Sequence, residues 1–387
     1  MSRADAVDNL RAPAGSLEQR ATRAVFLVAG LAMATWAPLV PFAKARLEIE
    51  EGTLGLLLLC LGLGSIVAMP ITGVLATRFG CRAVALASGV ILALTLPFLA
   101  IAATPLALAT VLVIFGASVG TLDVTMNIQA VIVEKDSARP MMSGFHGLFS
   151  LGGIIGAGGV SALLAFGLSP VYAAILVSVL ALIVLAASAK GLLPYGNAET
   201  GDAPLFVLPR GFIVLIGALC FLVFLAEGAV LDWSAVFLTE IRSFTPAKAG
   251  WGYAVFAIAM TGGRLLGDRI LAALGGQRIL LFGGFLAGLG FALIIASPLQ
   301  WTALAGFFLV GAGASNVVPV LFTVAGRQKD MPVSLAIASI TTLGYGGVLA
   351  GPALIGFVAH LSSLAVSFGL LAIAMLLISA NSWVSRR

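Results

Sequence analysis

Long apolar runs, separated by short polar connections, make up most of the chain. A helix needs about 20 apolar residues to span a bilayer, and charges, prolines and glycine or asparagine breaks delimit twelve such runs. The runs are too long and too uniformly apolar for the strands of a membrane barrel. The pattern predicts an all-α membrane protein with twelve transmembrane helices, at residues 22–44, 52–76, 83–103, 105–133, 141–165, 168–190, 209–240, 248–272, 277–297, 299–326, 332–358 and 361–384.

The longest polar connection divides this pattern nearly in half. Residues 189–210, AKGLLPYGNAETGDAPLFVLPR, are rich in glycine, proline and charge and fall between the sixth and seventh runs. Two sets of six helices are typical of secondary transporters built from internal repeats. We predict two pseudo-symmetric six-helix bundles, at 1–192 and 209–387, joined by a cytoplasmic linker at 193–208.

The basic residues predict the orientation. Of the 21 lysines and arginines, only Lys44, Arg46, Arg242 and Lys248 lie on one side of the predicted membrane, and the other 17 (21 minus four) share the opposite side with both tails. Cytoplasmic loops carry the excess of positive charge, so both termini are expected in the cytoplasm and the protein in the inner membrane. The first apolar run is longer than that of a signal peptide and is expected to be retained.

Composition excludes several other classes of protein. The chain is 60% hydrophobic and only 10% charged, whereas soluble domains carry about a quarter charged residues. Two histidines and three cysteines leave little for a metal site, and the glycine-rich stretches lack the lysine of a phosphate-binding loop. The net charge of +5 is spread over many loops. We expect no enzyme activity, no cofactor or metal, and no nucleic-acid partner.

Acids inside the apolar runs are the main candidates for chemistry. Gly116, Gly120, Asp123, Asn127 and Glu134 fall within about 60° of arc on one helix face. An acid facing lipid costs about 2.5–3.5 kcal/mol, so this face is expected to line a cavity or meet a partner.

Glu227 has a similar depth in the seventh run. Apolar surroundings penalise an ionised carboxyl group, which suits a residue that takes up and releases protons. Asp123 and Glu227 are therefore the proton-coupling candidates. A structural hydrogen bond within the bundle stays the alternative for each.

The connection after the second run carries a family motif. The segment GVLATRFGCR (73–82) resembles the cytoplasmic loop signature of the major facilitator superfamily, although Thr77 stands where that family usually has aspartate. A looser copy, GGRLLGDRILAALGGQR (262–278), retains Asp268 and Arg269. We also expect an ion pair between Arg264 and Asp268, four residues apart. The gating candidates are Arg78, Arg82, Asp232, Arg264, Asp268 and Arg269.

Further segments resemble YbjJ-type proteins, near the fucose-permease-like branch of that superfamily. They are DVTMNIQ (123–129), HGLFSLGG (146–153), AEGAVLDWSAVFLTE (226–240) and GYGGVLAGPALIG (344–356). The resemblance implies a monomer in the lipid bilayer, with a central cavity lined by spans one, four, seven and ten. The substrate-binding candidates are Trp36, Asn127, His146, Asn316 and Tyr345.

These features predict a secondary transporter that moves a small polar, sugar-like solute by alternating access, coupled to protons. One alternative is a proton-driven exporter of drugs or metabolites. Residues 150–159, SLGGIIGAGG, have the glycines but not the proline of the exporters' span-five signature. An alternative of another class is a transporter-like membrane sensor, although such a protein would usually append a soluble domain.

Overall fold

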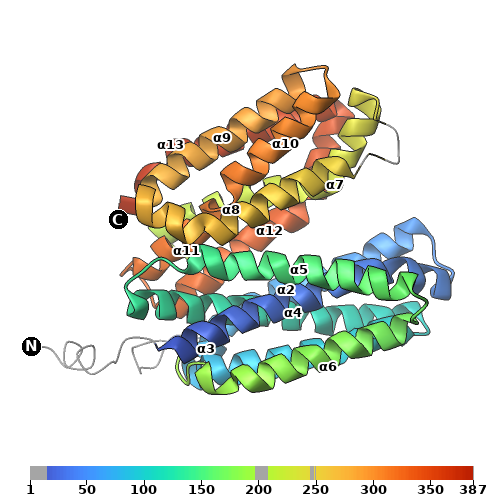
Figure 1. The fold of residues 1–387 in the computed structure, drawn as a ribbon, viewed down its shortest axis with the longest axis vertical. Coiled ribbons are helices and arrows are strands. Elements are labelled where there is room, and N and C mark those ends of the chain that lie inside the picture. Colours follow the sequence, from blue (N-terminus) through green and yellow to red (C-terminus); the bar gives the residue numbers. More distant parts are fainter. Residues whose placement is uncertain (1–14, 197–207, 245–247, 249, 387) are drawn as a thin grey trace, which may run out of the picture.

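The protein is described here by a computed structural model covering residues 15–196, 208–244, 248 and 250–386. Every regular element in this part is helical. Figure 1 shows two groups of helices, one formed by the N-terminal half of the chain and one by the C-terminal half. The prediction of an all-α chain is confirmed for the described residues. Most of the predicted linker, residues 197–207, lies outside them.

The N-terminal group consists of five long helices and a short one. They pack mainly against one another, with α3 on α4 and α2 on α5 as the largest contacts. Their bounds are α2 (Ser16–Leu47), α3 (Glu51–Ile101), α4 (Pro105–Ser137), α5 (Met142–Ala165), α6 (Pro170–Ser188) and η1 (Ala189–Gly191).

The C-terminal group has the same kind of packing, with α12 on α7 and α10 on α9. It meets the N-terminal group chiefly where α12 packs on α3 and α8 packs on α5. The bounds are α7 (Phe212–Arg242), α8 (Trp251–Leu274), α9 (Gly276–Ala296), α10 (Gln300–Ala314), α11 (Val317–Arg327), α12 (Val333–Leu361), α13 (Leu364–Ala380) and η3 (Ser382–Arg386).

Ten helices in the described part are long and apolar enough to cross a membrane. One of them is α3, which contains both the second and the third predicted spans. The eighth predicted span, α8, is not among the ten, because Arg264 and Asp268 lower its apolarity. These helices make the protein a multi-pass membrane protein.

A single glycine bends α3 where the sequence predicts a loop. Gly80 has φ 80° and ψ 159°, a conformation open essentially only to glycine. A Cβ there would also overlap the carbonyl group of Pro194. After the bend, the N–H of Arg82 has no partner within the helix and donates instead to the carbonyl of the linker residue Leu193, at 2.7 Å. The predicted loop at 77–82 is therefore one non-helical residue.

The tenth predicted span is interrupted in its middle. The helix stops at Ala314 and resumes at Val317, with Asn316 at φ −108° and ψ 2°. In a continuous helix the carbonyl of Ser315 would accept the N–H of residue 319. That residue is Pro319, which has no N–H. The break leaves the Ser315 carbonyl free to bind a side chain.

Two of the four basic residues that were predicted on the side opposite the termini donate hydrogen bonds to carbonyl groups at helix ends. Arg46 donates to the carbonyls of Leu99, Ala100 and Ala102, at the end of α3, at 2.6–3.0 Å. Arg242 donates to the carbonyls of Ile294 and Ile295, at the end of α9, at 2.7 Å. The last carbonyls of a helix lack partners within it. These two cations therefore cap helix ends.

Candidate functional site

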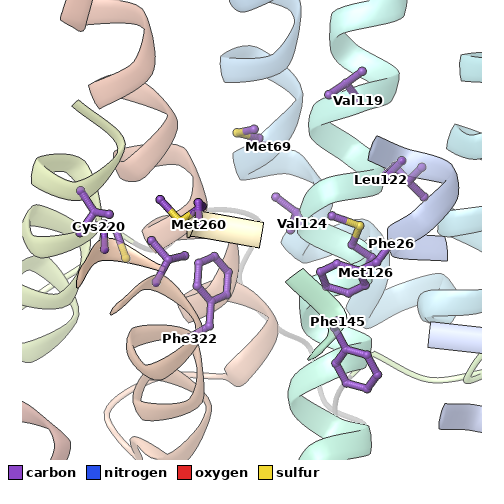
Figure 2. Packing of buried hydrophobic residues seen from close by; sticks show 14 of the residues in the cluster. Phe26, Met69, Val119, Leu122, Val124, Met126, Phe145, Cys220, Met260 and Phe322 are labelled. Carbon is purple, nitrogen blue, oxygen red and sulfur yellow. The ribbon is translucent and has the colours of Figure 1, made fainter. Parts of the chain in front are cut away.

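A cavity of about 190 Å³ lies between the two groups of helices. Its walls come from α2, α3 and α4–α5 on one side and from α7, α8, α11 and α12 on the other. The apolar lining includes Met126 and Phe322, which Figure 2 shows on separate groups of helices. The polar or aromatic residues that line it and were predicted as site residues are Asp123, Asn127, His146, Glu227, Arg264 and Tyr345.

On α4, Asp123 and Asn127 form one unit. Their spacing of four residues places them on the same helix face, and the Asn127 side-chain amide donates to the Asp123 carbonyl oxygen at 2.8 Å and to its carboxylate at 3.4 Å. Within the described residues, Oδ1 of Asn127 has no hydrogen-bond partner although it is buried. A buried acceptor of this kind can bind a donor from a water molecule or from a ligand.

Glu227 and Arg264 form an ion pair across α7 and α8. The guanidinium Nη2 lies 3.0 Å from the Glu227 carboxylate. Arg264 also donates through Nη1 to the hydroxyl of Ser150 on α5, at 3.1 Å, and through Nε to the Ser315 carbonyl, at 3.3 Å. The expected pair between Arg264 and Asp268 is wrong. The two side chains share a helix, but each finds its partner on a different neighbouring helix.

His146 sits in an aromatic setting on α5. Its ring makes edge contacts with Phe26 at 5.3 Å and with Phe322 at 5.6 Å, measured between ring centroids. Phe26 also stacks on Phe145 at 5.6 Å, and Figure 2 shows these two rings close together. The buried Nε2 of His146 has no hydrogen-bond partner among the residues described. His146 lines the cavity, whose walls come from both halves of the chain.

Two of the substrate-binding candidates do not line this cavity. Trp36 is buried on α2, one helix turn beyond the wall residue Met33, and is not itself part of the wall. Asn316 lies at the break between α10 and α11, where its amide donates to the Gly263 carbonyl at 2.9 Å and to the Ser315 hydroxyl at 3.0 Å. The polar residue of the tenth span therefore supports the break, next to the carbonyl that Arg264 binds.

Polar contacts between the two groups of helices gather at the start of α5. Asp268 of α8 accepts the backbone N–H of Gly144 with both carboxylate oxygens, at 3.1 Å. Glu134, at the end of α4, accepts the N–H groups of Met141 and Met142 at 2.7 Å and the hydroxyl of Thr323 on α11 at 2.6 Å. Two carboxylates thus cap one helix from opposite halves.

Glu134 was not among the residues predicted for the site. The sequence feature that could have identified Glu134 is its position on the same helix face as Asp123, at the end of an apolar run and just before the next helix. Between α3 and α12, the hydroxyls of Thr77 and Ser334 lie 2.5 Å apart. Ser334 belongs to the first turn of α12, so a hydroxyl pair joins the halves where the family's usual aspartate is missing.

The remaining gating candidates are placed differently. Arg82 donates from its side chain to the carbonyls of Leu192 and Lys190, at 2.8 and 3.0 Å, and so holds the end of the N-terminal group. Arg78, Asp232 and Arg269 are exposed. No group of three His, Cys, Asp or Glu side chains in the described part could hold a metal ion.

Comparison with known proteins agrees with this architecture. A sequence model of the Major Facilitator Superfamily matches residues 24–331. An uncharacterised transporter of the same type from Yersinia pestis is 58% identical over 368 residues, covering 95% of this chain and 96% of that protein.

Two solved structures share the fold at low sequence identity. FucP in its outward conformation has a TM-score of 0.81 at 15% identity and covers 95% of this chain and 98% of its own. The proton:xylose symporter XylE has a TM-score of 0.73 at 15% identity and covers 95% of this chain and 94% of its own. With the family match over most of its length, the chain belongs to the major facilitator superfamily of membrane transporters.

Proposed function

We propose that the protein is a secondary active transporter that moves a small polar, sugar-like solute across the inner membrane by alternating access, coupled to protons. The observation that carries this proposal is a single cavity lined by an acid from each half, Asp123 on α4 and Glu227 on α7. Ionisable residues within membrane helices are costly, and they mark ion and substrate pathways.

The proposal includes a topology of twelve spans in two six-helix bundles. It counts α3 as two spans divided at Gly80, α10 with α11 as one interrupted span, and α8 as a span despite its charges. Gly275, between α8 and α9, has φ 76° and ψ 156°. This nearly repeats the geometry of Gly80 at the corresponding joint and supports the proposed pseudo-symmetry. The basic residues support cytoplasmic termini.

Each cavity residue receives a role in this mechanism. Asp123 and Glu227 take up and release the coupling proton, while Asn127, His146 and Tyr345 contact the solute. Trp36 and Asn316 lie behind the cavity wall and act on it indirectly. A proton can drive the cycle only if it stabilises the two conformations differently. Glu227 meets this requirement through Arg264, because the arginine also binds Ser150 in the other half.

Contacts between the halves supply the gate. Three hydrogen bonds between the halves must break before the bundles can rock apart where they meet. They join Asp268 to Gly144, Glu134 to Thr323 and Thr77 to Ser334. XylE, and FucP of E. coli, are described as proton symporters of xylose and fucose. Their shared fold supports, by analogy, a sugar-like solute for this chain.

The test is coupled transport by the purified full chain. A thermal-shift screen against sugars, polyols, amino acids, nucleobases and lipophilic cations selects solutes, which are then offered to proteoliposomes with and without an imposed pH gradient. We expect accumulation above equilibrium only with the gradient, abolished by a protonophore. Equal uptake under both conditions would overturn proton coupling. Transport of lipophilic cations alone would favour the exporter, and binding without any flux would favour a sensor.

A further inference from the structure

The ion pair in the cavity indicates the chemical class of the solute. We propose that Arg264 is the solute-recognising residue and that the solute is a small hydroxylated carboxylic acid, whose carboxylate replaces that of Glu227 on the guanidinium. This inference rests on the proposed transport function and names the substrate class of the same cavity. The proposed substrate is then a sugar acid, or another hydroxylated acid of similar size, and not a neutral sugar.

Arg264 is held in place without the help of Glu227. Its Nε donates to the carbonyl of Ser315, which lacks a helical donor because residue 319 is proline. Its Nη1 donates to the hydroxyl of Ser150. A guanidinium carries five N–H donors, and the contacts to Ser315, Ser150 and Glu227 account for one on each nitrogen. The arginine therefore stays at the cavity wall with donors to spare when Glu227 leaves it.

The pair has the exposure expected of a binding group. The Glu227 side chain is 20% exposed and that of Arg264 is 9% exposed, and both line the cavity. Buried ion pairs contribute little net stability compared with apolar packing, so stability alone does not account for a charged pair at this place. Glu227 acts as the internal counter-ion of the arginine while the cavity is empty.

Charge balance then selects an anion. The other titratable or charged residues that line the cavity with Glu227 are Arg264 on α8, Asp123 on α4, His146 on α5 and Tyr345 on α12. Tyr253 on α8 lies within the electrostatic range of Glu227, Arg264 and Asp232. Arg264 is the sole lysine or arginine among the described residues that line the cavity. A proton on Glu227 removes the charge of the carboxylate that is paired with the guanidinium, and an unpaired charge in apolar surroundings is costly. A carboxylate restores neutrality, whereas a neutral sugar does not.

The rest of the cavity favours a small acid with hydroxyl groups. Its volume of about 190 Å³ equals the share of liquid volume of about six water molecules, which suits a solute of monosaccharide size. Oδ1 of Asn127 and Nε2 of His146 are buried and have no partner among the described residues. The asparagine oxygen can only accept a hydrogen bond, and a hydroxyl group would donate one.

The experiment compares matched charged and neutral probes. Binding of D-gluconate, D-glucuronate, D-glucitol and D-glucose to the purified full chain is measured by calorimetry, in mildly acidic and mildly basic buffer. We expect the two acids to bind at least about tenfold more tightly than their neutral counterparts. Arg264→Gln should weaken acid binding by about ten- to a hundredfold, as loss of a charged hydrogen-bond donor does. Arg278→Gln, which removes an exposed arginine on α9, should change nothing.

A second variant keeps the test decisive if Arg264→Gln does not fold. Glu227→Gln removes the competing carboxylate, so acids should bind at least as tightly as to the parent and with no difference between the two buffers. The inference is overturned if the neutral probes bind as well as the acids or if none of the four probes binds. It is also overturned if Arg264→Gln does not weaken acid binding or if Glu227→Gln does. Each of these outcomes leaves gradient-driven uptake of another solute standing, so the two proposals fail separately.

Discussion

Asp268, near the end of α8, holds the first turn of α5 by accepting the N–H of Gly144 with both of its carboxylate oxygens. A carboxylate at a helix N-terminus contributes about 0.3–2 kcal/mol. The corresponding contact between α3 and α12 is the uncharged pair of Thr77 and Ser334. The polar contact at one joint between the halves is therefore charged, and the polar contact at the other is a pair of neutral hydroxyl groups.

Neutralising Asp268 should open the end of the bundle that it closes. Asp268→Asn keeps the shape and weakens the interaction with the α5 terminus, so the ratio of closed to open molecules should fall by about two- to thirty-fold. Cysteines placed at Thr77 and Ser334, in a chain freed of its three native cysteines, report closure through their rate of oxidative cross-linking. An unchanged rate in the Asn variant would show that Asp268 does not hold the gate.

Thr323→Val should affect transport more than stability. The substitution removes the hydroxyl that Thr323 donates to Glu134 across the two halves, and it leaves the N–H groups of Met141 and Met142 bound to the same carboxylate. Solute flux in proteoliposomes should change while the melting temperature stays near that of the parent. Glu134→Gln is the comparison, because it weakens the cap of α5 as well and should lower the melting temperature. Equal effects of both variants on melting would contradict this division.

Asp123→Asn should uncouple transport from protons. The amide keeps the shape and polarity of the side chain but cannot carry the proton. Accumulation driven by a pH gradient should be lost, while exchange of solute across the proteoliposome membrane continues. Glu227→Gln is measured in parallel, since either acid is placed to bind the coupling proton. If both variants still concentrate the solute like the parent, neither acid is the coupling group.

Replacement of two equivalent glycines should separate backbone strain from packing. Gly80 and Gly275 have nearly the same φ and ψ, so alanine is strained by about 1–3 kcal/mol at either position. A Cβ at Gly80 would also overlap the Pro194 carbonyl, whereas a Cβ at Gly275 meets nothing within 4 Å. Gly80→Ala should therefore lower the melting temperature more than Gly275→Ala. The reverse order would show that the linker does not pack against the bend.

Reporter fusions test the proposed orientation. Fusions placed after Arg210 and after Arg387 should both report the cytoplasm, because most of the lysines and arginines share one side with the tails. A reporter active only outside the cytoplasm at both positions would reverse the topology. Opposite signals from the two fusions would refute an even number of spans in the C-terminal half.

The sequence by itself determined the class of the protein and the place of its helices. In a bilayer each helix must satisfy its own backbone groups and present apolar side chains over a fixed length. Both conditions are local, so apolar runs in the sequence predict the helices well. They also make Asp123 and Glu227 conspicuous. The break at Ser315 was not predicted, because prolines also lie inside helices that continue, such as Pro38 in α2 and Pro352 in α12. The twelve-span count stays a prediction.

Only the tertiary structure decided the partners of the charged side chains. The spacing of Arg264 and Asp268 predicted a pair within α8, yet Arg264 reaches Glu227, 37 positions away, and Ser150, 114 positions away. Glu134 likewise finds Thr323 189 positions along the chain. A charged side chain in an apolar bundle binds whichever complementary group the packing brings closest. That choice depends on how helices cross, because residues on neighbouring helices are unrelated in sequence spacing.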